Sequence, residues 1–343
     1  MIGLVDKHRK MKNNAIQEIW SKIKASKKVL MSLHYGPDGD SLASCVAMKY
    51  VLERDFGCEV KLVSKDNLDS ILGELPYVSE VDFGKGIEEL ERKNYDLIIL
   101  LDSANIKQFA GRNFPFAFSD NDFVINIDHH ATNEYFGNLN YVEHRPSTCS
   151  VLLDIFRATA VRFDKELATR VLLGIYTDTG YFSHDNGKSI IDAAFLIENG
   201  ADYLEGIVNK IKYNVPLRVK KYHALMYEHF KTANILGKTV GYSSVSLDEI
   251  RSLNLNLSEV RGAVNDLQEI GGFDIIFTLT EMENIIKGSF RSRKNIDVSR
   301  FALALGGGGH KAAAAFTLEK MFLSEAEGLV LRKIEEVGIH LAN

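Results

Sequence analysis

Four short stretches of the sequence carry carboxylates or imidazoles, the side chains that most often bind divalent cations in proteins. They are His34, Asp38 and Asp40 in HYGPDGD, Asp102 in LLDS, Asp128, His129 and His130 in IDHH, and Asp178 in YTDTG. A single aspartate has an ordinary explanation, because Asp is a favoured helix N-cap and Asp40 precedes a helical pattern. Four such clusters in one chain indicate a shared site instead.

The elements that must position these clusters can be read from the apolar pattern around them. Apolar runs at 27–35, 95–102 and 123–130 each end in one of the clusters, and they alternate with helical patterns. This alternation predicts a parallel sheet that is covered by helices on both faces. Ligands bind beyond the carboxyl ends of the strands in such sheets, so we expect the three strand-end clusters to lie at one edge. Asp178 is expected where a helix gives way to a glycine turn.

Four aspartates that meet in one crevice would repel one another strongly unless cations lay among them. Mixed carboxylate and imidazole ligands suit Mn²⁺, and also Mg²⁺, Fe²⁺ or Zn²⁺, and the excess of carboxylates favours ions that prefer oxygen. The number of ligands exceeds what one ion needs if that ion must also bind water and substrate. Two ions about 3.5–4 Å apart would fit, and this spacing is typical of phosphoryl hydrolysis.

The chain has 343 residues, which is enough for two domains. Helical patterns continue to about residue 232, with Pro216 expected to break one of them. The pattern then changes to strands, with a hairpin predicted at EMEN (281–284), a short helix, the glycine turn GGGGH and a terminal helix. We therefore expect a catalytic domain at 1–190, a helical linker at 191–235 and a smaller α/β substrate-binding domain at 236–343, with the active site in the cleft between the domains.

Charge and cysteine content narrow the class of protein. The net charge is −5, which disfavours binding of long nucleic acid, yet residues 285–311 hold six basic residues against one acidic residue. This basic patch, which includes Lys294, suits a small anionic ligand. The three cysteines are isolated, and no apolar run reaches the roughly 18–20 residues of a membrane span. We expect a cytoplasmic protein.

Together, these motifs resemble a known family. HYGPDGDSLAS, LLDSA, IDHH and YTDTGYF are similar, in that order, to the four motifs of the DHH phosphoesterases. SFRSR and GGGGH resemble the DHHA1 domain that follows in one branch of the family, and the arrangement looks most like the branch of oligoribonucleases (nanoRNases) and pAp phosphatases. Ala43 departs from the glycine that the family often has ahead of Ser44, which is a mild change on a helix.

The resemblance implies roles for individual residues. His34 and Asp38 would hold one metal ion, Asp40, His129 and Asp178 a second, and Asp102 would bridge the two. His130 would face the substrate phosphate as a catalytic residue together with Asp102, and Asp128 would orient an imidazole. The substrate-binding residues of the second domain would be Arg291, Ser292, Arg293, Gly307, Gly308 and His310. The glycines suit this role because backbone N–H groups without a neighbouring Cβ can approach an anion closely.

The function implied is a metal-dependent phosphoesterase with two divalent ions, Mn²⁺ first and Mg²⁺ second. It would degrade short oligoribonucleotides to 5′-mononucleotides as a 3′–5′ exonuclease, dephosphorylate pAp to AMP, or do both. The sequence leaves open a phosphodiesterase for linear or cyclic dinucleotides, an inorganic pyrophosphatase, and a nucleotide-binding protein without activity. Every expected metal-ligand position is filled, which disfavours a nucleotide-binding protein without activity. GGGGH disfavours a pyrophosphatase. A homodimer is a reasonable expectation.

Overall fold

The computed structural model describes residues 13–110, 116–183, 187–256, 259–260, 262–293 and 296–342. Lys294 of the basic patch lies outside these residues. The chain divides into two compact units, Met1–Asn214 and Val215–Asn343. Each is an α/β unit with its own sheet and its own apolar core, as expected from the sequence. Among the described residues, no helix is both long enough and apolar enough to cross a membrane.

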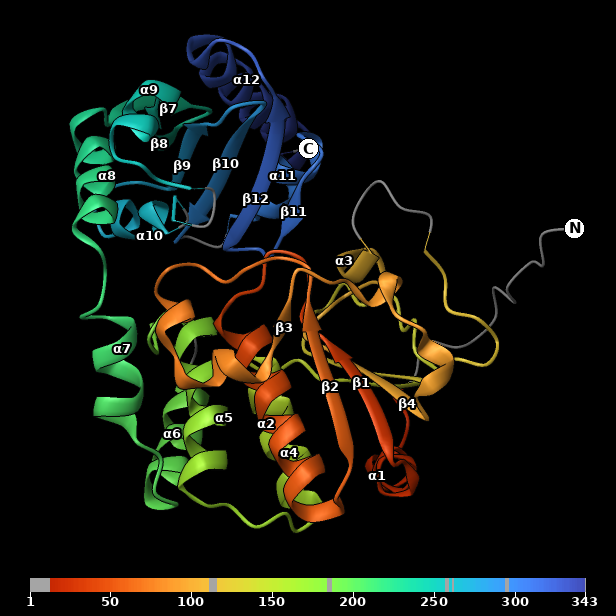
Figure 1. Ribbon diagram of the computed structural model, residues 1–343. Helices are drawn as coiled ribbons and strands as arrows, with labels where there is room; N and C mark the ends of the chain where they lie inside the picture. Colours follow the sequence, from red (N-terminus) through yellow and green to blue (C-terminus); the bar gives the residue numbers. More distant parts are fainter. Residues whose placement is uncertain are drawn as a thin grey trace, which may run out of the picture. The chain divides into compact units, whose positions relative to one another are not determined.

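The first unit is built around a six-stranded sheet in which every neighbouring pair is parallel. Figure 1 labels β1, β2, β3 and β4 of this sheet. The strand order is β3-β2-β1-β4-β5-β6. The strands are β1 (Lys28–Ser32), β2 (Glu59–Ser64), β3 (Asp82–Phe83), β4 (Leu97–Leu101), β5 (Val124–Asp128) and β6 (Leu139–Val142). The two outer strands, β3 and β6, are short and were not predicted.

The helices of this unit follow the predicted pattern, with several short turns added. The α-helices are α1 (Ile16–Ala25), α2 (Gly39–Phe56), α3 (Lys107–Ala110), α4 (Thr148–Ala158), α5 (Lys165–Asp178), α6 (Lys188–Glu198) and α7 (Asn209–Ile211). Four 3₁₀ turns, η1 (Leu72–Glu74), η2 (Pro76–Glu80), η3 (Ile87–Glu89) and η4 (Arg92–Asn94), lie between β2 and β4, and a π-helix, η5 (Tyr203–Val208), precedes α7.

Both faces of the first sheet are buried, which explains why its strands are continuously apolar. Met31 and Ile99 pack with α2, α4 and α5 in the main core, whereas Leu30, Ile98 and Leu100 pack in a smaller core on the opposite face. Alternate residues of one strand point to opposite faces, so a strand covered on both sides must be apolar at every position.

The second unit has a mixed sheet in the order β11-β12-β10-β9-β8-β7. Its strands are β7 (Lys231–Ile235), β8 (Lys238–Val245), β9 (Ile275–Glu281), β10 (Ile285–Ser292), β11 (Gly308–Gly309) and β12 (Ala313–Glu319). Its helices are α8 (Leu217–Glu228), α9 (Leu247–Ser252), α10 (Ala263–Gln268), α11 (Val298–Ala304) and α12 (Leu323–Ala342). The hairpin predicted at EMEN is confirmed as the β9–β10 connection. The break that was expected at Pro216 is confirmed: the helical pattern is interrupted between α7 and α8, and Pro216 is the N-cap of α8.

Candidate active site

The site lies at the carboxyl edge of the first sheet, at the point where the strand order reverses. From β1 the chain builds β2 and β3 on one side, and it then returns to build β4, β5 and β6 on the other. The loops that leave β1 and β4 therefore diverge, and this divergence opens the crevice in which α/β sheets bind ligands. His34 follows β1, Asp102 follows β4, and Asp128 is the last residue of β5.

The structure brings the six predicted ligands into two groups. His34, Asp38 and Asp102 form one group, and Asp40, His129 and Asp178 form the other, with ligand atoms within 4.8 Å of one another in each. Asp102 reaches both groups: its Oδ2 lies 3.6 Å from His34 Nε2, and its Oδ1 lies 3.5 Å from His129 Nε2. His129 Nε2 is also 3.5 Å from Asp178 Oδ2. Two ligand atoms that bind the same ion at about 2.0–2.2 Å are expected to lie about this far from each other.

Two of these aspartates are placed by helix ends. Asp38 is the N-cap of α2, and its carboxylate accepts hydrogen bonds from the backbone N–H groups of Asp40 and Ser41. The interpretation of Asp40 as the cap is therefore wrong, and Asp40 instead lies buried in the first turn. Asp178 is the last residue of α5, just before Gly180, in agreement with the expected helix end.

Asp102 has an unusual backbone. Its φ is +57°, in the left-handed region, which is uncommon for residues other than glycine but is tolerated by Asp. Burial acts to raise the pKa of Asp102, yet the hydrogen bond with His34 and the charges of His129 and His34 hold it below its usual range. Asp102 is therefore a buried carboxylate that stays ionised between two imidazoles.

All three histidines have one ring nitrogen fixed by a hydrogen bond to a neighbouring oxygen. The partners of Nδ1 are the carbonyl of Tyr35 for His34 (2.9 Å), the carbonyl of Arg145 for His129 (3.1 Å) and Oδ1 of Asp128 for His130 (2.7 Å). Carbonyl oxygens only accept, so Nδ1 carries the proton in His34 and His129, and Nε2 is directed to the carboxylates. Such contacts fix the orientation of metal-binding imidazoles.

The N-terminus of α4 supports the aspartates, and sequence reasoning missed this contribution. The backbone N–H groups of Thr148 and Cys149 donate to the two carboxylate oxygens of Asp40, at 2.6 and 3.1 Å. The Thr148 hydroxyl donates to Asp102 Oδ1 at 3.0 Å. A helix N-terminus carries partial positive charge, so it suits buried carboxylates. The signal in the sequence is Ser147, an N-cap residue directly before an apolar periodic stretch.

The electrostatics of the cluster fit a divalent cation. Burial, followed by the charge of Asp102, raises the pKa of Asp40 to about 7, and burial with the charges of Asp40 and Asp102 raises the pKa of Asp178 well above its usual value. For His34, burial lowers the pKa, but Asp102 and Asp38 outweigh it and raise the pKa to about 9. Carboxylates this close repel one another, and cations among them would remove the repulsion. The donor set of carboxylates and imidazoles suits Mn²⁺ or Mg²⁺.

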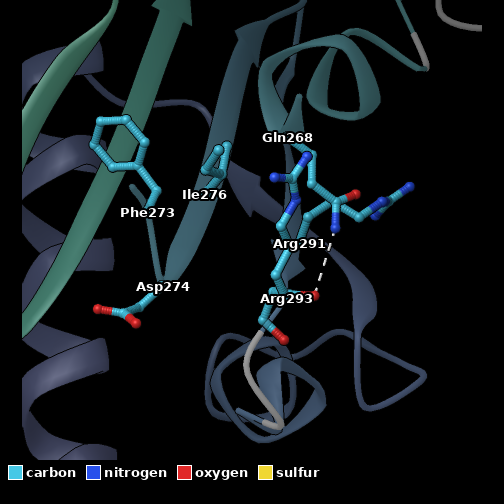
Figure 2. Close-up of a pocket in the computed structure, with 7 residues that line it drawn as sticks. Gln268, Phe273, Asp274, Ile276, Arg291 and Arg293 are labelled. Atoms are coloured by element: carbon cyan, nitrogen blue, oxygen red, sulfur yellow. Dashed lines mark hydrogen bonds between the residues drawn. The ribbon is translucent and has the colours of Figure 1, made fainter. Parts of the chain in front are cut away.

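In the second unit, the predicted arginines line a small hollow (Figure 2). Arg291 lies on β10, and its Nε donates to Asn265 Oδ1 at 2.8 Å. Ser292 is turned inward, and its hydroxyl donates to the carbonyl of Ile296 at 2.6 Å. The lining residues are Gln268, Phe273, Asp274, Ile276, Arg291, Ser292 and Arg293. The hollow thus combines two basic side chains with apolar and polar ones and with one carboxylate, that of Asp274.

The glycine run at 306–309 is also favoured by the packing and conformation of the backbone. A Cβ on Gly307 would lie 2.1 Å from the carbonyl oxygen of Ala315, so β12 passes too close for any side chain. Gly308 and Gly309 form β11 and pair with β12, and Gly306 has a φ of +77°. His310 follows as an exposed residue whose backbone N–H donates to the carbonyl of Ala313 at 2.8 Å. The run is therefore shaped partly by packing.

Comparison with known families agrees with these features. Residues 28–175 match the DHH family, N-terminal domain, and residues 237–337 match the DHHA1 domain. The chain therefore belongs to the DHH/DHHA1 phosphoesterase family.

The family members most informative here are bacterial. The chain is 28% identical over 335 residues to the bifunctional oligoribonuclease and PAP phosphatase NrnA of Thermus thermophilus, with 92% of this chain and 94% of the relative covered. It is 25% identical to the NrnA protein of Mycoplasma genitalium, with 94% and 99% covered. Among solved structures, an exopolyphosphatase-related protein from Bacteroides fragilis has the same fold, with a TM-score of 0.81 at 21% identity and coverage of 94% and 96%.

Proposed function

We propose that this chain is a two-metal phosphoesterase that degrades short oligoribonucleotides to 5′-mononucleotides, as a 3′–5′ exonuclease, and also dephosphorylates pAp to AMP. The observation that carries the proposal is the pair of ligand groups that share Asp102. Similarity to NrnA proteins along nearly the whole chain supports the choice of substrates.

The metal ions are proposed to be Mn²⁺, with Mg²⁺ as the alternative. His34 and Asp38 would hold one ion, Asp40, His129 and Asp178 the other, and Asp102 both. When bound, the ions supply Lewis acidity and lower the pKa of a bound water. Mixed imidazole and carboxylate ligands favour Mn²⁺ over Mg²⁺, because Mg²⁺ prefers oxygen ligands and retains several waters.

The protein's own residues would position the substrate phosphate. His130 would contact the phosphate through Nε2 while Nδ1 remains bonded to Asp128, and it would stabilise negative charge on the phosphoryl oxygens. We further propose that the first unit is catalytic and the second unit binds the substrate, the roles expected for 1–190 and 236–343. The helical linker expected at 191–235 is not a separate part, because the two units divide between Asn214 and Val215 and β7 (Lys231–Ile235) is a strand of the second sheet. In the second unit, the substrate contacts are proposed to come from Arg291, Ser292, Arg293, Gly307, Gly308 and His310.

The test is turnover of a panel of phosphate compounds with added Mn²⁺: RNA of three to five residues, pAp, pyrophosphate, linear pApA and cyclic di-AMP. Release of 5′-mononucleotides from the short RNA and AMP from pAp would support the proposal. Cleavage of pyrophosphate alone would replace it with a pyrophosphatase, and cleavage of the dinucleotides alone would indicate a dinucleotide phosphodiesterase. Short RNA labelled at its 5′ end shows the polarity, because a 3′–5′ exonuclease shortens it stepwise and keeps the label on the longer product.

A matched pair of variants tests the role of Asp102. Asp102→Asn keeps the shape of the side chain but removes its charge, and it should lower turnover by more than about 1,000-fold. Asp122→Asn changes another buried aspartate of the same unit, which pairs with Arg92 at 3.0 Å and has no contact with the ligand groups. It should keep turnover within about threefold. Retained activity in Asp102→Asn would contradict the two-metal proposal.

We also propose that two copies of the chain form a homodimer through α6. Ile190, Ile191 and Ile197 on this helix have exposed fractions of 55%, 71% and 44%, and with exposed Ala194 they form one apolar stripe. In an antiparallel two-fold pair, the exposed Lys188 of one copy would approach Glu198 at the other end of its partner helix. The charges at the two ends of the stripe are thus complementary.

Sedimentation equilibrium tests the homodimer. Ile191→Glu should shift the wild-type dimer to monomer, whereas Leu303→Glu, at a residue that is 70% exposed on α11, should leave it unchanged. A monomeric wild type, or a dimer that survives Ile191→Glu, would rule out this interface.

The cytoplasm is the proposed compartment, supported by three free and buried cysteines.

A further inference from the structure

Asn133 forms the centre of a buried hydrogen-bond network behind the site. Its side chain is 2% exposed, and its Nδ2 lies 2.6 Å from Asp128 Oδ2, 2.8 Å from Asn126 Oδ1 and 3.1 Å from the carbonyl oxygen of Ser103. These three oxygens come from the end of β5, its middle and the loop after β4. One carboxamide therefore joins two strand ends at the edge where the ligand groups lie.

The orientation of this carboxamide is determined by its partners. The Nδ2 group faces three oxygens, all of which accept, whereas Oδ1 accepts a hydrogen bond from the backbone N–H of Tyr135 at 2.7 Å. The backbone N–H of Asn133 in turn donates to the carbonyl of His130 at 3.1 Å. Reversing the amide would place an oxygen against three oxygens, so only one orientation satisfies the buried groups.

Asp128 connects Asn133 to His130. It is fully buried, and its two carboxylate oxygens have different partners: Oδ2 accepts from Asn133, and Oδ1 bonds to His130 Nδ1 at 2.7 Å. With Oδ2 held by Asn133, the carboxylate cannot rotate away from the imidazole. A buried carboxylate oxygen that lost its donor would carry a penalty of its own and would favour rearrangement of the pair.

We propose that Asn133 is a positioning residue for His130 and acts through Asp128. It fixes the carboxylate so that Nδ1 of His130 stays protonated and bonded to Asp128, and Nε2 keeps one direction toward the phosphate. The proposal rests on the proposed function for the role of His130, but the tautomer itself can be measured without a substrate. Nothing in the pattern IDHHATN distinguishes Asn133 from an ordinary turn residue.

The neighbouring carboxamide, Asn126, has another role. Its Nδ2 donates to the carbonyls of Leu100 and Ser103, both at 3.3 Å, so it ties β5 to the end of β4. Only its Oδ1 faces Asn133. Substitution of Asn126 would therefore disturb the sheet, and Asn133 is the residue whose change tests the link to Asp128.

The experiment compares Asn133→Ala with Asn140→Ala. Asn140 is also a buried asparagine of this unit (5% exposed), but its carboxamide bonds to the backbone of Gly137 rather than to Asp128. Steady-state kinetics with the best substrate of the panel should show kcat lowered about 10- to 100-fold in Asn133→Ala, with KM and the Mg²⁺ dissociation constant within about threefold. Asn140→Ala should leave kcat within about twofold.

Imidazole ¹⁵N spectra of histidine-labelled, Mg²⁺-loaded protein give the second readout. The His130 signals are assigned by their loss in His130→Gln. In the wild type and in Asn140→Ala, we expect the Nδ1 signal of a protonated nitrogen, and in Asn133→Ala we expect a mixture of tautomers. An unchanged His130 spectrum in Asn133→Ala would overturn the proposal. An altered spectrum with no turnover in any protein would sustain the positioning role while contradicting the proposed function.

Discussion

The hydroxyl of Thr148 donates a 3.0 Å hydrogen bond to Oδ1 of Asp102, the carboxylate that lies between the two ligand groups. Thr148 is the first residue of α4, and its backbone N–H also donates to Asp40. One helix end therefore restrains an aspartate from each loop of the crevice, although the residues are far apart in sequence. The contact makes α4 part of the site even though α4 supplies none of the predicted ligands.

Replacing Thr148 with Val removes this hydrogen bond while it keeps the shape of the side chain and the backbone N–H. We expect metal affinity to fall about tenfold, because groups that orient metal ligands typically contribute 10- to 100-fold. Isothermal titration with Mn²⁺ measures the change. Thr169→Val is the control, since Thr169 is also buried but its hydroxyl donates to the carbonyl of Lys165 and accepts from the backbone N–H of Asp202, neither of which is a predicted ligand. Equal affinities in the two variants would show that Thr148 does not support Asp102.

Gly174 permits the close packing of α5 against the site. A Cβ at this position would lie 2.3 Å from Cys149 Sγ and 2.5 Å from Asp40 Oδ1, both inside van der Waals contact. Gly174→Ala should therefore lower the free energy of unfolding by about 1–3 kcal/mol, and it should weaken metal binding by displacing Asp40.

Gly328→Ala provides the matched control for Gly174→Ala. Gly328 is also a helical glycine, and its added Cβ would approach only the flexible end of Arg332, at 3.2 Å. Alanine is the better helix former, so this change should leave stability unchanged or raise it by up to about 1 kcal/mol. Thermal unfolding of both variants checks the pair. Equal stability in the two variants would mean that α5 can move away from Asp40 without cost.

The strand-end residues could be predicted from the sequence because the signal is local. Leu97–Leu101 is uniformly apolar and Asp102 follows it directly, so a buried strand with a polar end needs no long-range information. Parallel topology then predicts that such ends meet. The helix end at Asp178 is local in the same way.

The supporting contacts could not be predicted because they depend on distant partners. Thr148 meets Asp102 across 46 positions, and no spacing rule in the sequence encodes that contact. Strand β6 is another example, since it has only four residues and its outer edge is paired by Asn13 and Asn14. Short edge strands carry little periodicity, and the side chains that cover them lie elsewhere in the chain. The N-cap of α2 is Asp38 rather than Asp40, because the carboxylate of Asp38 accepts hydrogen bonds from the backbone N–H groups of Asp40 and Ser41. The sequence alone does not distinguish these two aspartates as the cap.

Asp164, the N-cap of α5, should give the first unit a measurable pH dependence. Burial alone would raise the pKa of this carboxyl, but the backbone N–H of Leu167, the Tyr50 hydroxyl and Arg54 all donate to it and lower the pKa overall. The pKa of Asp164 in the folded state is lower than its value of about 3.9 in the unfolded chain. The ionised carboxylate therefore stabilises the folded state at pH values above about 3.9, and this stabilisation is lost as the pH falls through the folded-state pKa.

Asp164→Ala should therefore cost about 1–2 kcal/mol of unfolding free energy at pH 7, and the difference from the wild type should shrink below about pH 4. Trp20, the sole tryptophan of the sequence, is buried in the core of the first unit, so its fluorescence during urea unfolding reports on that unit. Asp164→Asn keeps the capping oxygen without the charge, and it should lose less stability at pH 7. A difference for Asp164→Ala that stayed constant down to pH 3 would contradict the ionic contribution.

Metal binding should stabilise the first unit, because cations placed among Asp40, Asp102 and Asp178 remove the repulsion that raises two of their pKa values. A ligand at about 100 times its dissociation constant adds about 2.7 kcal/mol to the free energy of unfolding. Thermal unfolding followed by Trp20 fluorescence should therefore shift to higher temperature with Mg²⁺ or Mn²⁺, and EDTA should reverse the shift. Asp122→Asn should keep the metal-dependent shift, and Asp102→Asn should lose most of it. If Asp102→Asn kept the full shift, the ions would have to bind somewhere other than between the two ligand groups.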